Sequence, residues 1–139
     1  MTKKVNTKEI GFLLKGIELL ESHLNEPHTT VEADSTFKFN INIEHKIDPS
    51  KNILIVVTAV NIFIEKEKDI VGSIKTSVIY EIANLLDFLT DKGFELPQDL
   101  VTTLNSIALS TSRGMMFSQF RGTFLHNTFL PILDPKSFK

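Results

Sequence analysis

Histidine is the residue type in this sequence best suited to chemistry near neutral pH, because its ring titrates there and binds metals. The sequence contains four histidines: His23, His28, His45 and His126. They are scattered along the chain and do not form the paired ligand sets of a zinc site. We therefore expect ordinary polar or surface histidines and no metal site.

Acidic side chains gather at Glu65, Glu67 and Asp69, within a stretch that also contains lysines. Two readings are open, a catalytic carboxylate cluster or a charged hairpin turn that keeps a sheet soluble. Hairpin turns are commonly charged for this reason, so the sequence favours the turn. No triad or other catalytic constellation stands out elsewhere, and we expect no enzyme activity.

Two arginines precede glycines, in Ser112-Arg113-Gly114 and in Arg121-Gly122. Neither stretch has the repeated glycines of a phosphate-binding loop. Arg113 and Arg121 are instead expected to donate charge-assisted hydrogen bonds to carbonyls or carboxylates that fix a helix end. The sequence therefore indicates no nucleotide or other cofactor.

Composition limits the classes of function further. The chain has 139 residues, a formal net charge of −2 and no cysteine. This charge gives no electrostatic reason to bind nucleic acid or an anionic membrane, and disulfides and thiolate metal sites are excluded. The first residues lack the apolar core of a signal peptide, and no apolar run approaches the ~20 residues of a membrane helix. We expect a single cytoplasmic domain over residues 1–139.

Large apolar side chains are unusually dense between Met115 and Leu133, and the chain contains eleven phenylalanines but one tyrosine. Methionine is flexible and common at surfaces that bind varied partners. These side chains either fill a core or subunit interface, or remain exposed. A domain of this size cannot bury all of them, so some are expected to meet another subunit or a client.

The segment from Pro97 to Arg121 predicts a long helix, about 36 Å at 1.5 Å per residue. Proline suits the first turn, Asp99 complements the helix dipole, and Gly122 is expected to end the helix. One face is apolar, with Leu100, Leu104, Ile107, Ala108 and Met115. A second face is small, with Thr103, Ser106 and Ser110. Such a helix is suited to lying between two packed layers.

The middle of the chain predicts a three-stranded antiparallel meander. Residues 36–44 alternate apolar and polar side chains, which is typical of a half-buried strand. Residues 53–65 are apolar on both faces, which predicts a central strand covered on both sides. Residues 70–80 form a further strand, and short turns at 48–52 and 65–69 join neighbours. Residues 81–90 are expected to form a short helix or loop.

The segment Lys8–Glu26 is ambiguous. Ile10, Leu13, Leu14 and Ile17 begin a helical stripe, which slightly favours a helix. Phe12, Leu14, Leu20 and Leu24 also fit one face of an interrupted strand.

Taken together, these motifs resemble SecB, the bacterial protein-export chaperone, and more closely the SecB-like proteins. Arg121-Gly122-Thr123-Phe124, followed by Pro131, is similar to a SecB segment with a proline at the same distance. Arg113 falls where SecB also has an arginine. Phe12, Ile17 and Pro27 repeat a spacing found in the first strand of SecB. The resemblance spans nearly the whole chain.

The resemblance implies an α+β fold: a four-stranded antiparallel sheet, with the long helix of the C-terminal half packed on one face. It makes Lys8–Glu26 a strand, in place of the helix that the pattern slightly favours. It also implies a homotetramer, a dimer of dimers with the long helices between the dimers. Arg113, Arg121, Gly122 and Pro131 would then have structural roles.

The activity implied is that of an ATP-independent holdase, which binds unfolded or nascent polypeptides in apolar grooves. SecB passes its clients to the SecA motor, while SecB-like proteins serve antitoxins, so the partner is a broad set of clients, SecA, or one specific protein such as an antitoxin. Export itself is left open, because SecB continues past the matching proline into a helix and tail that help engage SecA. We expect the client-binding residues to be Leu85, Phe88, Met116, Phe117, Phe120, Phe124 and Phe129.

Overall fold

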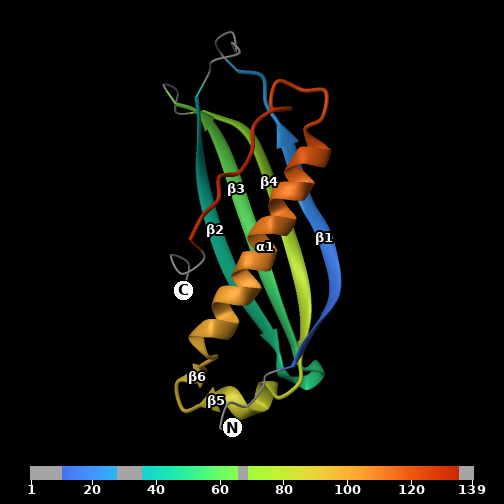
Figure 1. Cartoon of the computed structure of the whole chain (residues 1–139), viewed down its shortest axis with the longest axis vertical. Coiled ribbons are helices and arrows are strands. Elements are labelled where there is room, and N and C mark those ends of the chain that lie inside the picture. Colours follow the sequence, from blue (N-terminus) through green and yellow to red (C-terminus); the bar gives the residue numbers. More distant parts are fainter. Residues whose placement is uncertain (1–10, 28–35, 66–68, 135–139) are drawn as a thin grey trace, which may run out of the picture.

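The computed structural model describes residues 11–27, 36–65 and 69–134, and it consists of one antiparallel sheet with a long helix across one face (Figure 1). The strand order is β1-β4-β3-β2. The sheet strands and the helix are β1 (Phe12–Leu24), β2 (Phe37–Asp48), β3 (Ile53–Ile64), β4 (Ile70–Ile82) and α1 (Gln98–Gln119). This arrangement confirms the predicted fold class.

Strands β2, β3 and β4 form the predicted meander. Alternation places one side chain in two toward α1, so that Ile41 faces Val60 and Phe39 faces Ile62 across the β2–β3 pair. The first turn is the short 3-10 helix η1 (Pro49–Lys51), where the Asp48 carboxylate accepts hydrogen bonds from Ser50 N at 3.2 Å and Ser50 Oγ at 2.7 Å. Within the second predicted turn, residues 66–68 lie outside the described residues.

The first element is a strand, so the helix favoured by its local pattern is wrong and the strand implied by the resemblance is confirmed. β1 pairs with β4, and its register shifts between Leu14 and Gly16 and again between Leu19 and Glu21. Each irregularity adds one residue, so that one face of β1 carries Phe12, Leu14, Ile17, Leu19, Ser22 and Leu24. The resulting alternation of two- and three-residue steps imitates helical spacing, which explains the wrong prediction.

Helix α1 begins directly after Pro97 and has Asp99 in its first turn, as predicted. It ends at Gln119, two residues before the predicted end, and Gly122 follows with a φ of 78°. Its buried residues are Leu100, Leu104, Asn105, Ala108, Leu109, Ser112 and Met116. The small face, with Thr103, Ser106 and Ser110, is exposed.

Between β4 and α1 the chain forms three short elements at one end of the sheet (Figure 1). They are the 3-10 helix η2 (Leu85–Phe88) and the strands β5 (Leu89–Thr90) and β6 (Gly93–Phe94). The short helix agrees with one of the two alternatives predicted for residues 81–90. Leu85 is buried there, whereas Leu86 and Leu89 are exposed.

The core between sheet and helix consists of two apolar clusters. The first, which we call the hairpin cluster, lies near the short elements and comprises Leu54, Val56, Val78, Tyr80, Ile82, Leu85, Leu100, Leu104 and Ala108. The second, which we call the strap cluster, comprises Val60, Ile62, Ile64, Val71, Ile74, Leu109, Met116, Phe120, Leu125 and Leu130. Along both central strands the two clusters are separated by a single buried threonine.

These threonines and one serine form what we call the polar belt: Thr58, Thr76 and Ser112. Thr58 of β3 is paired directly with Thr76 of β4. The hydroxyls of Thr76 and Ser112 are hydrogen bonded at 2.8 Å, whereas the buried Thr58 Oγ1 has no partner among the described residues. The belt therefore interrupts the apolar contact between helix and sheet near its middle.

The prediction that β3 is central is confirmed, but its two faces differ. On the face toward α1 its residues are buried, while on the other face Val57 is buried and Ile53, Ile55 and Phe63 are half-buried. Within the described part of the chain, only that first face has a helix across it. Ile55 lies opposite Lys46 and Ile53 lies opposite Glu81, so long charged side chains flank the second face.

Candidate functional site

The chain that follows α1 turns back along the same face of the sheet, beside the helix (Figure 1). We call residues 120–134 the strap. Its turn is held by Thr123, whose hydroxyl donates to Phe120 O at 2.7 Å and accepts from Leu125 N at 3.1 Å. Gly122 N donates to His126 Nδ1 at 3.2 Å. The positive φ of Gly122 suits a residue without a Cβ atom.

Arg113 connects the strap to the helix. Its Nε donates to Leu130 O at 2.8 Å, and its Nη2 donates to Pro131 O at 2.9 Å. Arg113 thus binds main-chain carbonyls, as expected, but these carbonyls belong to the strap and not to the end of the helix. Arg121 lies exposed just beyond the helix.

The strap packs on the sheet through two leucines, Leu125 and Leu130, which are both 1% exposed. A Cβ atom added to Gly72 of β4 would lie 2.5 Å from Leu125 Cδ1, so the leucine needs the space that glycine leaves. Phe124 and Leu133 are partly buried against the same cluster. The strap thus covers the end of the sheet that the helix leaves open.

The seven expected client-binding residues do not form one surface. Leu85, Met116 and Phe120 are buried in the core, so they line no open groove in this structure. Leu85 and Phe88 belong to the hairpin cluster, whereas Met116, Phe120 and Phe124 belong to the strap cluster. The sequence predicted their apolar character, but burial depends on which neighbours cover each side chain.

Phe117 and Phe129 are the two expected residues that remain exposed, at 46% and 54%. Their rings stack with centroids 6.1 Å apart and planes 17° apart, and the His126 ring lies 6.1 Å from Phe117. This contact joins the outer side of α1 to the strap. The two rings form an exposed aromatic patch. The sequence pattern alone did not distinguish these two phenylalanines from those buried in the core.

The largest run of exposed apolar side chains lies on β1, which the sequence prediction did not include. Each is between 39% and 60% exposed: Leu13, Leu14, Ile17, Leu19, Leu20 and Leu24. Monomeric proteins rarely expose a contiguous apolar surface of this kind. β1 is also an edge strand, so one side of its backbone faces no other strand of the described chain. The signal in the sequence that could have predicted this exposed surface is the presence of apolar residues on both faces of an irregular strand.

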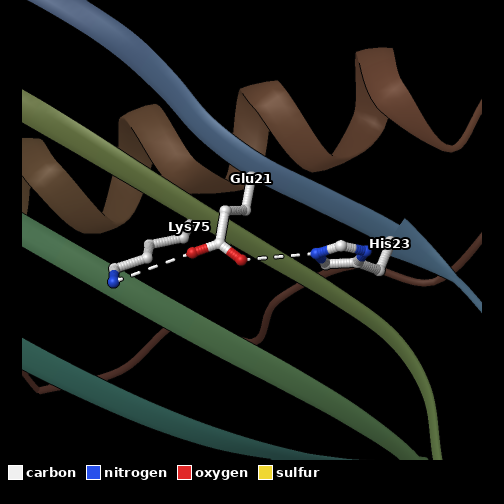
Figure 2. Close-up of polar contacts among 3 residues, drawn as sticks. All are labelled: Glu21, His23 and Lys75. Atoms are coloured by element: carbon white, nitrogen blue, oxygen red, sulfur yellow. Dashed lines mark hydrogen bonds and ion pairs between the residues drawn. The ribbon is translucent and has the colours of Figure 1, made fainter.

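Polar side chains on β1 and β4 form one small cluster on the other face of the sheet (Figure 2). The Glu21 carboxylate lies 3.3 Å from His23 Nε2 and 3.9 Å from Lys75 Nζ. All three side chains are substantially exposed to solvent, which weakens such pairs. Within the described ranges, no group of three or more His, Cys, Asp or Glu side chains could hold a metal ion.

Buried polar groups are few and are used in packing. His45 Nε2 lies 2.7 Å from Asn105 Oδ1, which joins β2 to α1. The hydroxyl of Tyr80 donates to Leu104 O at 3.0 Å, and burial raises the pKa of this tyrosine well above its usual value. Among the residues with described structure, no helix is long and apolar enough to cross a membrane. None of these groups faces an open site.

Comparisons with known proteins agree with this geometry at the level of the fold. No family model matches the sequence, and no curated protein matches it. Among solved structures, the SecB-like chaperone Rv1957 of Mycobacterium tuberculosis, in complex with a ChAD peptide from the HigA1 antitoxin, has a TM-score of 0.58 and 14% identity. The similarity covers 88% of this chain and 90% of that chain.

A second solved structure is a protein of unknown function from Streptococcus agalactiae, with a TM-score of 0.40, 13% identity, and coverage of 81% of this chain and 89% of that chain. The similarity to the first structure extends over nearly the whole of both chains. The chain therefore has a SecB-like fold.

Proposed function

We propose that this protein is an ATP-independent chaperone that holds unfolded or nascent polypeptides on exposed apolar surface. The observation that carries the proposal is the exposed aromatic patch of Phe117 and Phe129 in a chain with a SecB-like fold. Each Å² of apolar surface that a client covers contributes about 25 cal/mol. Apolar contact makes little demand on client sequence, which suits a holdase.

The same surfaces also support self-association. β1 offers both a free strand edge and apolar side chains, and the exposed small face of α1 permits close approach of another helix. We propose that sister subunits cover these two surfaces in a homotetramer, a dimer of dimers. The aromatic patch of Phe117 and Phe129 is then left for the client.

A dedicated role is the alternative, in which the partner is one specific protein such as an antitoxin. The neighbouring structure from Mycobacterium tuberculosis contains an antitoxin peptide, which favours this alternative over an unrelated interaction protein. Delivery of clients to SecA and a cytoplasmic location are further parts of the proposal. Both versions require no chemical step, in keeping with a non-enzymatic protein.

The experiment is a light-scattering assay in which the purified protein is added to an unrelated, aggregating polypeptide. We expect wild type to delay aggregation and Phe117→Gln, which changes a residue of α1 and none of the strap, to lose most of this effect. Leu86→Gln is the matched control, because Leu86 is 57% exposed but lies in η2, away from the aromatic patch. Equal activity of both variants, or inactivity of wild type toward every client including its own copurifying partner, would refute the proposal.

Copurification from the native cell separates the two versions. A general holdase is expected to bring down many polypeptides in small amounts. A dedicated chaperone is expected to bring down one protein in stoichiometric amount.

A further inference from the structure

The end of the strap has the form of an extended peptide bound in a groove. Residues 128–134 have no helix or strand assignment, yet their side chains alternate between buried and exposed from Thr128 to Pro131. Leu130 enters the strap cluster, while Phe129 and Pro131 point outward into solvent-accessible positions. Alternation of this kind is what an extended chain shows when one side of it faces an apolar surface.

The contacts that hold this segment do not depend on its sequence. Arg113 donates to two consecutive main-chain carbonyls, those of Leu130 and Pro131. Every polypeptide offers such carbonyls, and a guanidinium with fixed, planar donors suits them. Leu130 supplies the most deeply buried apolar contact, Leu133 packs against the same cluster, and Phe129 stacks on Phe117. We call the place filled by the Leu130 side chain the seat.

We propose that the place occupied by residues 128–134 is itself a polypeptide-binding site, and that this segment is an internal stand-in which an extended client displaces. The occupant is an unfolded polypeptide with an apolar residue for the seat and main-chain carbonyls for Arg113. This inference rests on the proposed chaperone function and identifies its binding site. It also gives a role to Met116 and Phe120, which lie buried in the strap cluster and would meet the client's side chain.

Displacement is feasible because few side chains of the segment are buried. Ile132 is 87% exposed and Phe129 is 54% exposed, so Leu130 and Leu133 supply most of the apolar contact. Segments with few buried contacts open more readily than the rest of a fold. The measured affinity for a client is then reduced by the fraction of molecules in which the segment is closed. Weakening the segment should therefore strengthen client binding.

The test compares two leucine-sized deletions in the same segment. Leu130→Ala empties the seat but leaves the receiving residues of sheet and helix unchanged. Ile132→Ala removes a similar side chain that packs on nothing substantial. Binding of fluorescently labelled, reduced and carboxymethylated lactalbumin is measured by anisotropy, with circular dichroism to show that each variant is folded.

We expect Leu130→Ala to bind this client at least about fivefold more tightly than wild type, because its closed state is less populated. Ile132→Ala should bind as wild type does. Leu133→Ala removes a partly buried contact, so it should also raise the affinity for the client, but by less. This variant replaces Leu130→Ala in the test if Leu130→Ala does not fold. Unchanged or weaker binding by a folded variant would overturn the inference.

A peptide with the sequence of residues 126–134, added in trans, provides a second measurement. It should compete with the client for Leu130→Ala, because both occupy the same place. Failure to compete would place the client elsewhere and overturn the inference while leaving the chaperone proposal intact. If wild type and all variants bind no client, the chaperone proposal itself fails.

Discussion

The two edge strands of the sheet are built in opposite ways. β2 alternates regularly, with apolar side chains toward α1 and exposed polar residues on its other face, namely Lys38, Asn40, Asn42, Glu44 and Lys46. β1 has two irregularities in its pairing and exposes six large apolar side chains. Charged and polar side chains on an edge strand discourage pairing with another chain. The contrast supports our proposal that β1, and not β2, is the edge at which subunits associate.

The polar side-chain contacts that hold the two edge strands in place also differ. β2 is joined to the helix layer through His45 and Asn105, a contact that is partly buried. The polar side-chain contacts of β1 to the rest of the sheet are exposed or partly exposed and go to β4: Lys15 to Glu81, Glu18 to Ser77 and Glu21 to Lys75. β2 is therefore fastened to the core of the subunit, whereas β1 is held to β4 through contacts at the surface.

The largest effect is expected from placing a charge on β1. Ile17→Asp introduces a carboxylate where the side chain is 44% exposed in the single subunit, so the subunit should still fold. In an assembly the same carboxylate would be buried and unpaired, which is strongly unfavourable. We expect the mass measured by light scattering to fall to one half or one quarter of the wild-type value.

Asn40→Asp is the control for this experiment, because it places the same charge on the exposed face of β2. Its mass should equal that of wild type. A monomeric wild type, or dissociation by both variants, would remove the distinction between the two edges.

The reverse experiment truncates β2 on its buried side. Phe39→Ala removes a partly buried ring from the strap cluster. Full burial would make this cost 3–5 kcal/mol, so we expect the free energy of unfolding to fall by about 2 kcal/mol. Denaturant titration measures this loss, and light scattering should show an unchanged mass. A change of mass without a loss of stability would mean that β2 is an interface and not part of the core.

The pH dependence of the free energy of unfolding reports whether water reaches the core beside β1. Tyr80 is fully buried beside β1, where its ring lies 5.9 Å from that of Phe12 at 81°. Burial raises its folded pKa above the ordinary value of 10.0. The contribution of the protonated Tyr80 to the free energy of unfolding is therefore complete below pH 10. It decreases as the pH rises above 10, because only the unfolded state loses the tyrosine proton there. We expect the free energy of unfolding to fall by up to about 1.4 kcal/mol per pH unit above 10.

Tyr80 is the single tyrosine of the chain, so tyrosinate absorbance near 295 nm reports on this residue alone. The absorbance should rise only when the protein unfolds, and Tyr80→Phe should remove this part of the alkaline destabilisation. Titration of the folded protein near pH 10 would show that water reaches the phenol.

The smallest effect is expected on the charged face of β1. Glu21→Gln removes the carboxylate that contacts His23 and Lys75 while keeping its size (Figure 2). Exposed ion pairs contribute little, so the free energy of unfolding should change by less than about 0.5 kcal/mol, with no change in mass. A loss above about 1 kcal/mol would show that this face is covered and that β1 is buried on both sides.

The sequence predicted the regular parts of the fold and failed where regularity was broken. The alternation within residues 36–44 predicted β2, which continues to Asp48, and the start of α1 was predicted from Pro97 and Asp99. β1 was assigned from its local pattern to the wrong class, because two pairing irregularities displace its apolar residues from a period of two. The resemblance to SecB predicted a strand there, because the order of motifs along a chain is unaffected by an extra residue within a strand.

The candidate site was less predictable than the fold. Arg113 was correctly expected to bind carbonyls, because a guanidinium near a helix end has few other partners. Exposure was harder to predict: Met116 and Phe117 are neighbours in sequence, yet one is buried and the other is 46% exposed. A helix rotates by about 100° per residue, so which of two adjacent apolar residues faces the sheet depends on the packing of the whole helix.

The polar belt of Thr58, Thr76 and Ser112 has a consequence for how substitutions combine. Rearrangement in a packed interior is transmitted through touching side chains, and on the two central strands the belt replaces such contacts with hydroxyls, while Ile43 packs against both clusters. Damage at Leu104 and damage at Leu125 should then be felt independently, so that their costs simply sum in the double variant. Residues of one cluster can therefore be substituted during evolution without compensating substitutions in the other cluster.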